Sequence, residues 1–448
     1  MLGTPSTCSA AGADRLLSAT ARRPPIAEYY VHGRGRGHAS RGKTMVQALE
    51  QYGYHVCVFV DPDVAAMVQS VGSERVAVTS MPVGASLPSV WRSFTTLLSR
   101  FFMDADCSIC QRREYSPDVI VTDGDFPGAW RAVRADIPAV AVGHGYVFSS
   151  TNRPAFASKE PWRAQRRLNK RTTDLADCTV GVSYYPLSPT NNHTIIAKPR
   201  LRDQFLRLER RVPARPRIVT YFRDEGVGAE VLDVLAATGY EILAFGTGSA
   251  VTTTRSGVRV LPFDETLFLN SLAEASAVVG TSGDNLIAES MTLGIPMLGL
   301  YRAGDDEQQL NAEMLEHAGF GLKSSFEDLN ASLIQHFLDN LDLFTGSAPT
   351  TNWQAPDAVA ATFECIKKVS HRAREWHRHL DGLDEDMVGP VAEARRRLLL
   401  EPPRAVTASP PPVVADAAAA ALQAVSNQQA ERAADAAEAD VSFEFFGV

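Results

Sequence analysis

Short apolar runs alternate with amphipathic stretches along most of the chain. The apolar runs of the first half lie at 28–31, 55–60, 118–122 and 138–142, and helical patterns such as 41–52 and 126–135 separate them. Continuous apolar runs of this length, divided by helices, are typical of parallel strands that are buried on both faces. The first half is therefore predicted to be a doubly wound α/β domain.

A second series of the same kind follows a basic, proline-punctuated stretch at 198–217. Its expected strands are 217–222, 241–245, 258–261, 277–279 and 297–300. The predicted fold class is α/β, with two doubly wound Rossmann-like domains that face a central cleft. Ligands of open parallel sheets bind at the carboxyl ends of the strands, so the loops after residues 31, 122, 245 and 280 are expected to face that cleft.

These patterns also divide the chain into segments. A flexible lead is expected at 1–26, the first domain at 27–200, a linker at 201–216, the second domain at 217–400 and a disordered tail at 401–448. Residues 357–400 have the pattern of charged helices, which we expect to pack back across the domains. The tail is low in complexity and rich in alanine and proline, which does not favour a packed core.

Composition narrows the class of protein. The 448 residues are 45% hydrophobic, which is enough to fill two domain cores. The net charge of −8 arises from 44 basic and 52 acidic residues, and it gives no indication of a nucleic-acid partner. No run approaches the roughly 20 apolar residues of a membrane-spanning helix. A cytoplasmic protein is expected, with at most peripheral membrane contact.

Six cysteines are scattered through the chain, a distribution that predicts reduced thiols more than a disulfide framework. Cys57 lies in an apolar run and is expected to be a core thiol. Cys107 and Cys110 alone have the spacing of metal ligands or a redox pair. A structural zinc site needs a second pair nearby, and none is visible in the local sequence, so no metal site is predicted.

The most informative segment is 280–312. It contains a small-residue turn that follows an apolar strand and opens a helix, made of Ser282, Gly283, Asp284 and Asn285. The unpaired N–H groups and the positive dipole end of such a helix favour a phosphate. Glu289 lies about one and a half turns further on, where its carboxylate can accept from two ribose hydroxyls. Side chains for the hydroxyls of a sugar follow at Glu307, Gln308 and Asn311. The alternative is an ordinary crossover between parallel strands.

This segment resembles the donor half of GT-B glycosyltransferases, through Ser282-Gly283, Glu289, Gly294-x-Pro296 and Glu307-Gln308-x-x-Asn311. It looks closest to the UDP-glycosyltransferases and to the transferase that makes the lipid-linked peptidoglycan precursor. Residues 29–41, YYVHGRGRGHASR, are similar to an amino-terminal glycine-histidine-arginine motif of that superfamily. The resemblance covers about residues 27–330. It implies a hexosyltransferase that needs neither a resident cofactor nor a metal and uses a UDP-sugar as co-substrate.

The resemblance also implies a catalytic base. Inverting members place a histidine in the first loop, which here is His38, and an acid often orients it. Asp123 is the first candidate for that acid because it directly ends the predicted strand, and Asp125 is the second. The rival base is His144, which follows the next strand. Neutral imidazole takes a proton from an attacking hydroxyl near neutral pH.

Further donor-side roles follow from the same resemblance. Arg223 ends the first strand of the second domain and is expected to neutralise the pyrophosphate. Gly246 and Thr247 follow the next strand and are expected to close around the nucleotide. Phe263 is placed near the uracil, with a core position as the alternative. The chain lacks the long signature box of plant-type transferases and the glycine-rich donor loop of the peptidoglycan enzyme, so the sequence leaves the sugar open.

Two other activities compete with this interpretation. Residues 37–44, GHASRGKT, match the P-loop expression of nucleotide hydrolases, with 118–125 as a magnesium-binding strand end. A sugar-nucleotide 2-epimerase has the same two-domain fold. On the acceptor side, the basic stretch 159–171 surrounds Trp162, which suggests a phosphorylated or lipid-linked acceptor, whereas a solvated helix face is the alternative.

Overall fold

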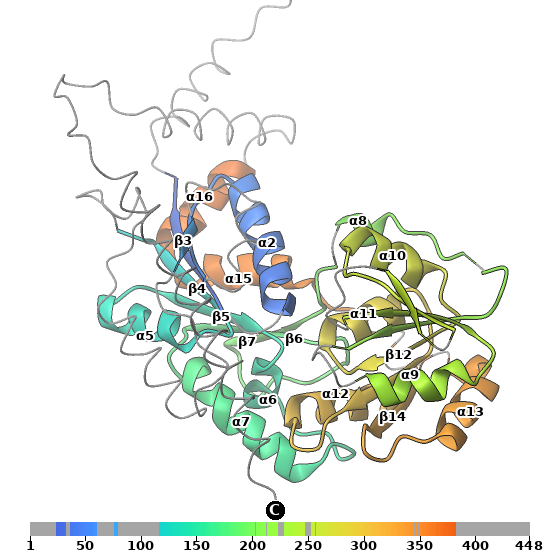
Figure 1. Ribbon diagram of the computed structural model, residues 1–448. Helices are drawn as coiled ribbons and strands as arrows, with labels where there is room; N and C mark the ends of the chain where they lie inside the picture. Colours follow the sequence, from blue (N-terminus) through green and yellow to red (C-terminus); the bar gives the residue numbers. More distant parts are fainter. Residues whose placement is uncertain are drawn as a thin grey trace, which may run out of the picture. The chain divides into compact units, whose positions relative to one another are not determined.

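Two seven-stranded sheets organise the chain in the computed structural model (Figure 1). The structure describes residues 24–32, 36–60, 76–78, 116–201, 203–211, 213–222, 228–246, 252–255, 257–344, 346, 350 and 352–381. Among the described strands, every pairing is parallel apart from the antiparallel pair β10 and β11. The α/β class with two Rossmann-like halves is confirmed.

The first sheet has the strand order β3-β2-β1-β4-β5-β6-β7. Its strands are β1 (Ile26–Val31), β2 (His55–Val60), β3 (Val76–Val78), β4 (Val119–Asp123), β5 (Ala139–Gly143), β6 (Cys178–Val182) and β7 (Thr194–Ala197). The helices between them are α2 (Arg36–Gln51), α5 (Phe126–Ala135), α6 (Tyr146–Ser150) and α7 (Lys159–Thr173). The order reverses between β1 and β4, which therefore form the topological switch point of this sheet.

The second sheet has the order β10-β11-β9-β8-β12-β13-β14. Its strands are β8 (Arg217–Tyr221), β9 (Glu241–Phe245), β10 (Thr253–Arg255), β11 (Val258–Val260), β12 (Ala277–Thr281), β13 (Met297–Tyr301) and β14 (Gly321–Ser325). The helices are α8 (Asp203–Leu206), α9 (Ala229–Ala236), α10 (Glu265–Ala273), α11 (Asp284–Thr292), α12 (Asp306–His317) and α13 (Ala331–Asp339), followed by the short 3-10 helix η2 (Leu341–Leu343). The switch point of this sheet lies between β8 and β12.

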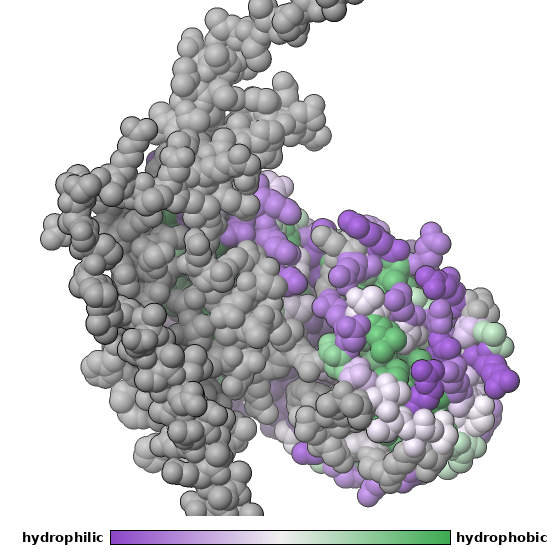
Figure 2. All heavy atoms as spheres, turned by 45° about the horizontal axis from the view of Figure 1, so that its top comes forward, coloured by the Kyte–Doolittle hydropathy of each residue, from purple (hydrophilic) through white to green (hydrophobic). Residues whose placement is uncertain are grey.

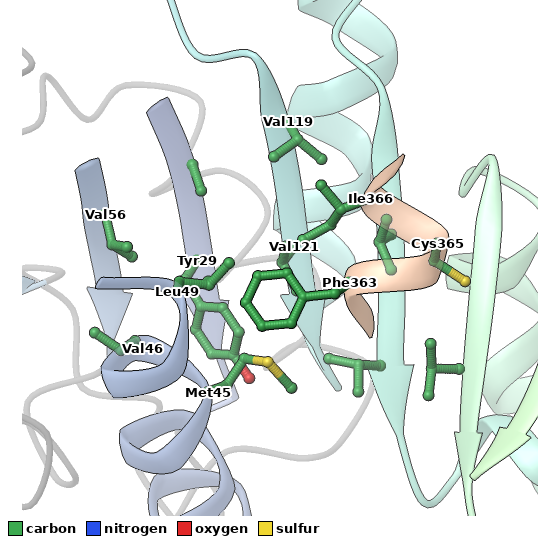
Figure 3. Close-up of a cluster of buried hydrophobic side chains, with 14 of the residues drawn as sticks. Tyr29, Met45, Val46, Leu49, Val56, Val119, Val121, Phe363, Cys365 and Ile366 are labelled. Carbon is green, nitrogen blue, oxygen red and sulfur yellow. The ribbon is translucent and has the colours of Figure 1, made fainter. Parts of the chain in front are cut away.

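Two helices after the second sheet pack against the first. They are α15 (Ala358–Val369) and α16 (His371–Asp381), and α15 lies against β5, β6 and β7. Their buried side chains join those of α2, β1 and β4 in one cluster, in which the Phe363 ring lies near Tyr29 and Val121 (Figure 3). The core of the first sheet is therefore completed by residues from the far end of the described chain.

A disulfide joins this helix to the sheet. Cys178 of β6 and Cys365 of α15 are bonded, with their Cα atoms 5.7 Å apart. The prediction of reduced thiols is wrong for this pair, because the two cysteines are 187 residues apart and only the packing of α15 brings them together. A disulfide persists in oxidising surroundings and is rare in the cytosol, which does not fit the expected cytoplasmic location. Cys57 is fully buried, as expected of a core thiol.

One face of the described residues can be followed in Figure 2. Figure 2 shows a largely hydrophilic face on the side of the second sheet, with apolar residues scattered over it. None of the described helices combines the length and the apolar character that a membrane span requires. Cys107, Cys110 and the expected tail at 401–448 lie outside the described residues, as does most of the expected lead, although β1 already begins at Ile26.

The packing of α15 gives a stability prediction. Phe363→Ala removes a ring that is only 6% exposed, and we expect it to lower the free energy of unfolding by about 3–5 kcal/mol. Urea unfolding followed by circular dichroism measures this loss. The matched control is Leu343→Ala, because the Leu343 side chain is 68% exposed and its removal is expected to change stability by less than about 0.5 kcal/mol. Equal effects of the two substitutions would show that α15 does not complete the first core.

Candidate active site

The residues singled out in the sequence gather at the two switch points. His38 lies in the first turn of α2, which follows β1, and Asp123 is the last residue of β4. Strands β1 and β4 are neighbours, with Val31 paired to Asp123. In the second sheet, α11 begins directly after β12, so its first turn lies at the carboxyl end of that strand. Both positions are where open parallel sheets bind ligands.

His38 and Asp123 are in direct contact. The distance from His38 Nδ1 to Asp123 Oδ1 is 2.7 Å. Because a carboxylate only accepts hydrogen bonds, Nδ1 carries the hydrogen of this pair. The Nε2 atom therefore holds the lone pair, and it forms no hydrogen bond with any residue that the structure describes. The His38 side chain is 28% exposed, so this nitrogen can reach a ligand.

Gly124 makes room for the histidine. Its φ angle is +71°, and a Cβ at this position would lie 2.6 Å from His38 Cε1. The left-handed backbone and the close ring both require glycine here. The turn after β4 thus has two functions, since it carries Asp123 at its start and lets the His38 ring approach.

Arg41 holds the other side of the carboxylate. Its Nε and Nη2 atoms donate to Asp123 at 2.8 and 2.5 Å, and Nη2 lies 3.0 Å from His38 Nδ1. Tyr29 donates to the same carboxylate at 3.1 Å. Burial alone would raise the pKa of Asp123, but Arg41 and His38 outweigh it and lower that pKa to about 2. Asp123 is consequently ionised throughout the physiological pH range.

Helix α2 also meets the start of α11. Arg41 Nη1 lies 3.8 Å from Asp284 Oδ2, and a side-chain carbon at Gly37 would lie 3.4 Å from Asn285 Nδ2. Burial lowers the pKa of Arg41, but Asp123 and Asp284 outweigh it and raise that pKa above its ordinary value. A permanent positive charge therefore lies between the histidine pair and the predicted phosphate-binding turn.

The turn at 282–285 has an open side. Gly283 is the N-cap of α11 and supplies no side chain to cap the helix, and a Cβ added to it would meet nothing within 4 Å. Its own N–H donates to Thr281 O, and the Ser282 hydroxyl donates to Leu300 O. Asp284 Oδ2 is buried without a hydrogen-bond partner. The groups left for an anion are the backbone N–H groups of the first turn of α11.

The predicted sugar-binding residues differ in how they lie. Glu289 and Gln308 are buried, with 4% and 5% exposed, and Glu307 is half-buried in the first turn of α12. Asn311 is fully buried, and its amide is held by His144 and by the Ser282 carbonyl. In this conformation Asn311 therefore connects elements of the protein.

The nucleotide-side candidates lie around β8, β9 and β11. Phe263 is half-buried and packs against Tyr221 and Phe268, with ring centroids 5.8 Å from each. Gly246 has a φ angle of +77°, and a Cβ there would lie 2.2 Å from Phe222 O, so close backbone packing explains this glycine. Arg223 and Thr247 lie outside the described residues.

The structure contradicts the P-loop alternative. Residues 37–44 are all part of α2, which begins at Arg36. A P-loop needs its first residues in a loop that wraps the phosphates before the helix starts. The rival base His144 is 3% exposed, and both its ring nitrogens contact protein carbonyl oxygens. It has no free nitrogen for a substrate proton in this conformation.

Arg41 is the site residue that sequence reasoning missed. Its position three residues after His38 was the available signal, because residues three or four apart share a helix face.

Comparisons with known proteins agree with this geometry. A family model described as glycosyl transferase family 1 matches residues 27–342. A curated relative from Methanosarcina acetivorans, an uncharacterized glycosyltransferase, is 20% identical over 331 residues, which cover 66% of this chain and 85% of the relative.

Solved structures show the same fold. LpCGTa in complex with UDP has a TM-score of 0.53 at 15% identity, over 82% of this chain and 99% of that one. MurG of Acinetobacter baumannii has a TM-score of 0.51 at 15% identity, over 77% of this chain and all of that one. The fold is thus the GT-B arrangement that the sequence resemblance implied.

The contact between Gly124 and His38 can be tested by a double-mutant cycle. Gly124→Ala alone is expected to destabilise the protein through backbone strain and through the clash with the ring. In the double variant His38→Ala/Gly124→Ala the clash is relieved. We therefore expect the double variant to lose at least about 1 kcal/mol less stability than the sum of the losses of the two single variants. Urea unfolding of all four proteins measures the coupling.

The control cycle combines His38→Ala with Gly239→Ala. Gly239 has a similar φ angle of +79° with nothing within 4 Å of an added Cβ, so this pair is expected to be additive. Additivity at Gly124 as well would mean that the His38 ring does not lie against that glycine.

Proposed function

The chain belongs to glycosyl transferase family 1, and from that premise we propose that it moves a sugar from a UDP-sugar to an acceptor hydroxyl with inversion at the anomeric carbon. The observation that carries the proposal is the His38–Asp123 pair, whose accessible Nε2 lies on the helix that meets the uncapped start of α11. A base and an anion-binding helix end are the two groups that this transfer requires.

The acceptor step uses the histidine pair. Nε2 of His38 takes the proton of the acceptor hydroxyl as the oxygen attacks the anomeric carbon, and the bond to the leaving diphosphate breaks. The imidazolium that forms is stabilised by Asp123, which stays ionised because Arg41 lowers its pKa. Asp123 also fixes the ring so that Nε2 faces the ligand.

The donor step uses the start of α11. Its free N–H groups donate to the diphosphate, which the helix dipole also attracts. Their positive potential stabilises the charge that develops as the diphosphate leaves. Arg41 offsets the negative charge of Asp284 beside this site. Glu289 is assigned to the ribose, and Glu307 and Gln308 to the sugar. Arg223, Gly246, Thr247 and Phe263 keep the nucleotide-side roles proposed from the sequence. The binding of UDP by LpCGTa supports the choice of nucleotide.

A nucleotide panel tests the donor. UDP, GDP, dTDP, ATP and GTP are compared by thermal shift, and UDP is expected to raise the melting temperature most, because ligand binding to the native state stabilises it. Glu289→Ala is expected to weaken UDP binding at least tenfold. His38→Ala is expected to leave UDP binding within about twofold and to lower the rate of sugar transfer at least about 100-fold.

Three outcomes would contradict the proposal. No shift with any nucleotide would remove the donor site, and equal transfer rates in His38→Ala and the unaltered protein would remove the base. Isomerisation of a UDP-sugar without any acceptor would instead favour the epimerase.

A basic stripe on α7 points to the acceptor. Its exposed members recur every three or four residues and so lie on one helix face: Arg163, Arg166, Arg167, Lys170 and Arg171. Leu168 of the same helix is 64% exposed, while Trp162 is buried. We propose that this face binds an anionic membrane and so presents a lipid-linked, phosphorylated acceptor.

Co-sedimentation with phosphatidylserine vesicles tests the stripe. The triple change Arg166→Glu, Arg167→Glu and Arg171→Glu is expected to weaken binding by about 100-fold or more, because each basic residue near the surface contributes about 1 kcal/mol. The control has the same charge change at three other exposed arginines, Arg207, Arg211 and Arg215, and is expected to bind as the unaltered protein does. Equal losses in both variants, or binding that salt does not reduce, would contradict the proposal.

A further inference from the structure

His144 contacts two acceptors at once. It directly follows β5 and is only 3% exposed. Nδ1 lies 2.9 Å from the backbone oxygen of Val182 in β6. Nε2 lies 2.7 Å from Oδ1 of Asn311 in α12. Backbone carbonyl oxygens cannot donate, so the bond to Val182 needs a hydrogen on Nδ1.

The orientation of the Asn311 amide is fixed independently. Its Nδ2 atom donates to the backbone oxygen of Ser282 at 2.9 Å. If the amide were rotated, Asn311 Oδ1 would face the Ser282 oxygen at that distance, and no hydrogen would lie between the two oxygens. Tyr184 donates to the Asn311 backbone oxygen at 2.7 Å and holds the residue from the other side. Asn311 Oδ1 is therefore the atom that faces His144 Nε2, and it is an acceptor.

Counting hydrogens then decides the state of the ring. A neutral imidazole has only one N–H. Its other ring nitrogen would carry a lone pair and would face the lone pair of an acceptor oxygen. An imidazolium donates from Nδ1 to Val182 O and from Nε2 to Asn311 Oδ1, while Asn311 Nδ2 donates to Ser282 O. A buried acceptor left unsatisfied loses its hydration with no hydrogen bond in exchange, which favours the protonated ring even though burial disfavours the charge.

The surroundings of the ring are mostly aromatic. Tyr184 stacks on it at 6.2 Å between centroids, and Phe148 meets it edge-on at 5.5 Å. The ring face of Tyr184 attracts a cation. Titratable and charged groups on the neighbouring elements are Tyr146 of α6, Arg41 of α2, Asp284 of α11 and Glu313 of α12, in addition to Tyr184. The positive charge of Arg41 is offset by Asp123 of β4 and by Asp284 of α11.

We propose that His144 is a positively charged positioning residue, whose second proton ties β5 and β6 to Asn311 and, through Asn311, to the turn that precedes α11. The inference rests on the proposed donor site, since Ser282 leads into the helix end that accepts the diphosphate. Loss of the proton removes one of the two bonds. Asn311 Oδ1 then faces the lone pair of Nε2, and this repulsion pushes the amide away from the Ser282 carbonyl, so affinity for the diphosphate falls.

Nitrogen NMR of the full chain with labelled histidine tests the charge. One buried histidine is expected to show hydrogens on both ring nitrogens at pH 6, and its signals are expected to vanish in His144→Gln. They should persist in the control His193→Gln, because His193 is exposed. If His144→Gln does not fold, Asn311→Ser assigns the signals instead, since it removes the acceptor at Nε2. A neutral tautomer at pH 6 in the folded protein would overturn the proposal.

The pH profile of UDP affinity tests the consequence. In the unaltered protein and in His193→Gln, affinity is expected to fall at least fivefold as the pH rises through the titration that NMR reports for His144. His144→Gln is expected to show a flat profile. A UDP profile in the unaltered protein that does not follow this titration would overturn the positioning role. No UDP binding at any pH would refute the proposed donor, while the NMR result would still decide the charge of His144.

Discussion

The chemistry of the first half depends on one buried carboxylate. Asp123 has no solvent exposure, and burying an ionised carboxylate costs several kcal/mol unless charged or hydrogen-bonding partners offset it. His38, Arg41 and Tyr29 are those partners, and each is held in position by the same oxygens. The buried carboxylate thus orients the base, because the ring of His38 donates to one of its oxygens.

The same group connects the two halves. Arg41 extends from Asp123 towards Asp284 at the start of α11, so the position of the base and that of the anion site are coupled through one guanidinium. An apolar cluster supports this polar connection. It joins Phe148 and Trp162 of the first half to Leu310 and Met314 of α12. Glu313 of α12 also accepts from the N–H and hydroxyl of Ser158, the N-cap of α7. Large apolar contacts of this kind oppose relative motion of two domains.

How far the sequence predicts this fold depends on burial. All nine strands expected from apolar runs are present, because strands covered on both faces must be continuously apolar. Five described strands were not expected, namely β3, β6, β7, β10 and β14. The strand β14 was missed because its sequence GLKSS is half polar and it lies at the end of its sheet. The His38–Asp123 pair was implied by the family resemblance, and the structure brings the two residues together because β1 and β4 are neighbouring parallel strands that end at the same edge. The disulfide was not predicted, because two cysteines 187 residues apart leave no local pattern in the sequence, whereas the packing of α15 on the first sheet agrees with the expectation for 357–400.

Asn311 shows why residue type alone did not decide its place in the site. An amide after a strand end can address sugar hydroxyls or backbone carbonyls equally well, and the choice depends on what the fold brings next to it. Here β5 brings His144 and β12 brings the Ser282 carbonyl. The Ser282 carbonyl fixes the orientation of the Asn311 amide. This orientation determines which ring nitrogens of His144 must carry hydrogen. A polar residue predicted to contact a ligand thereby sets the geometry of the helix end that contacts it.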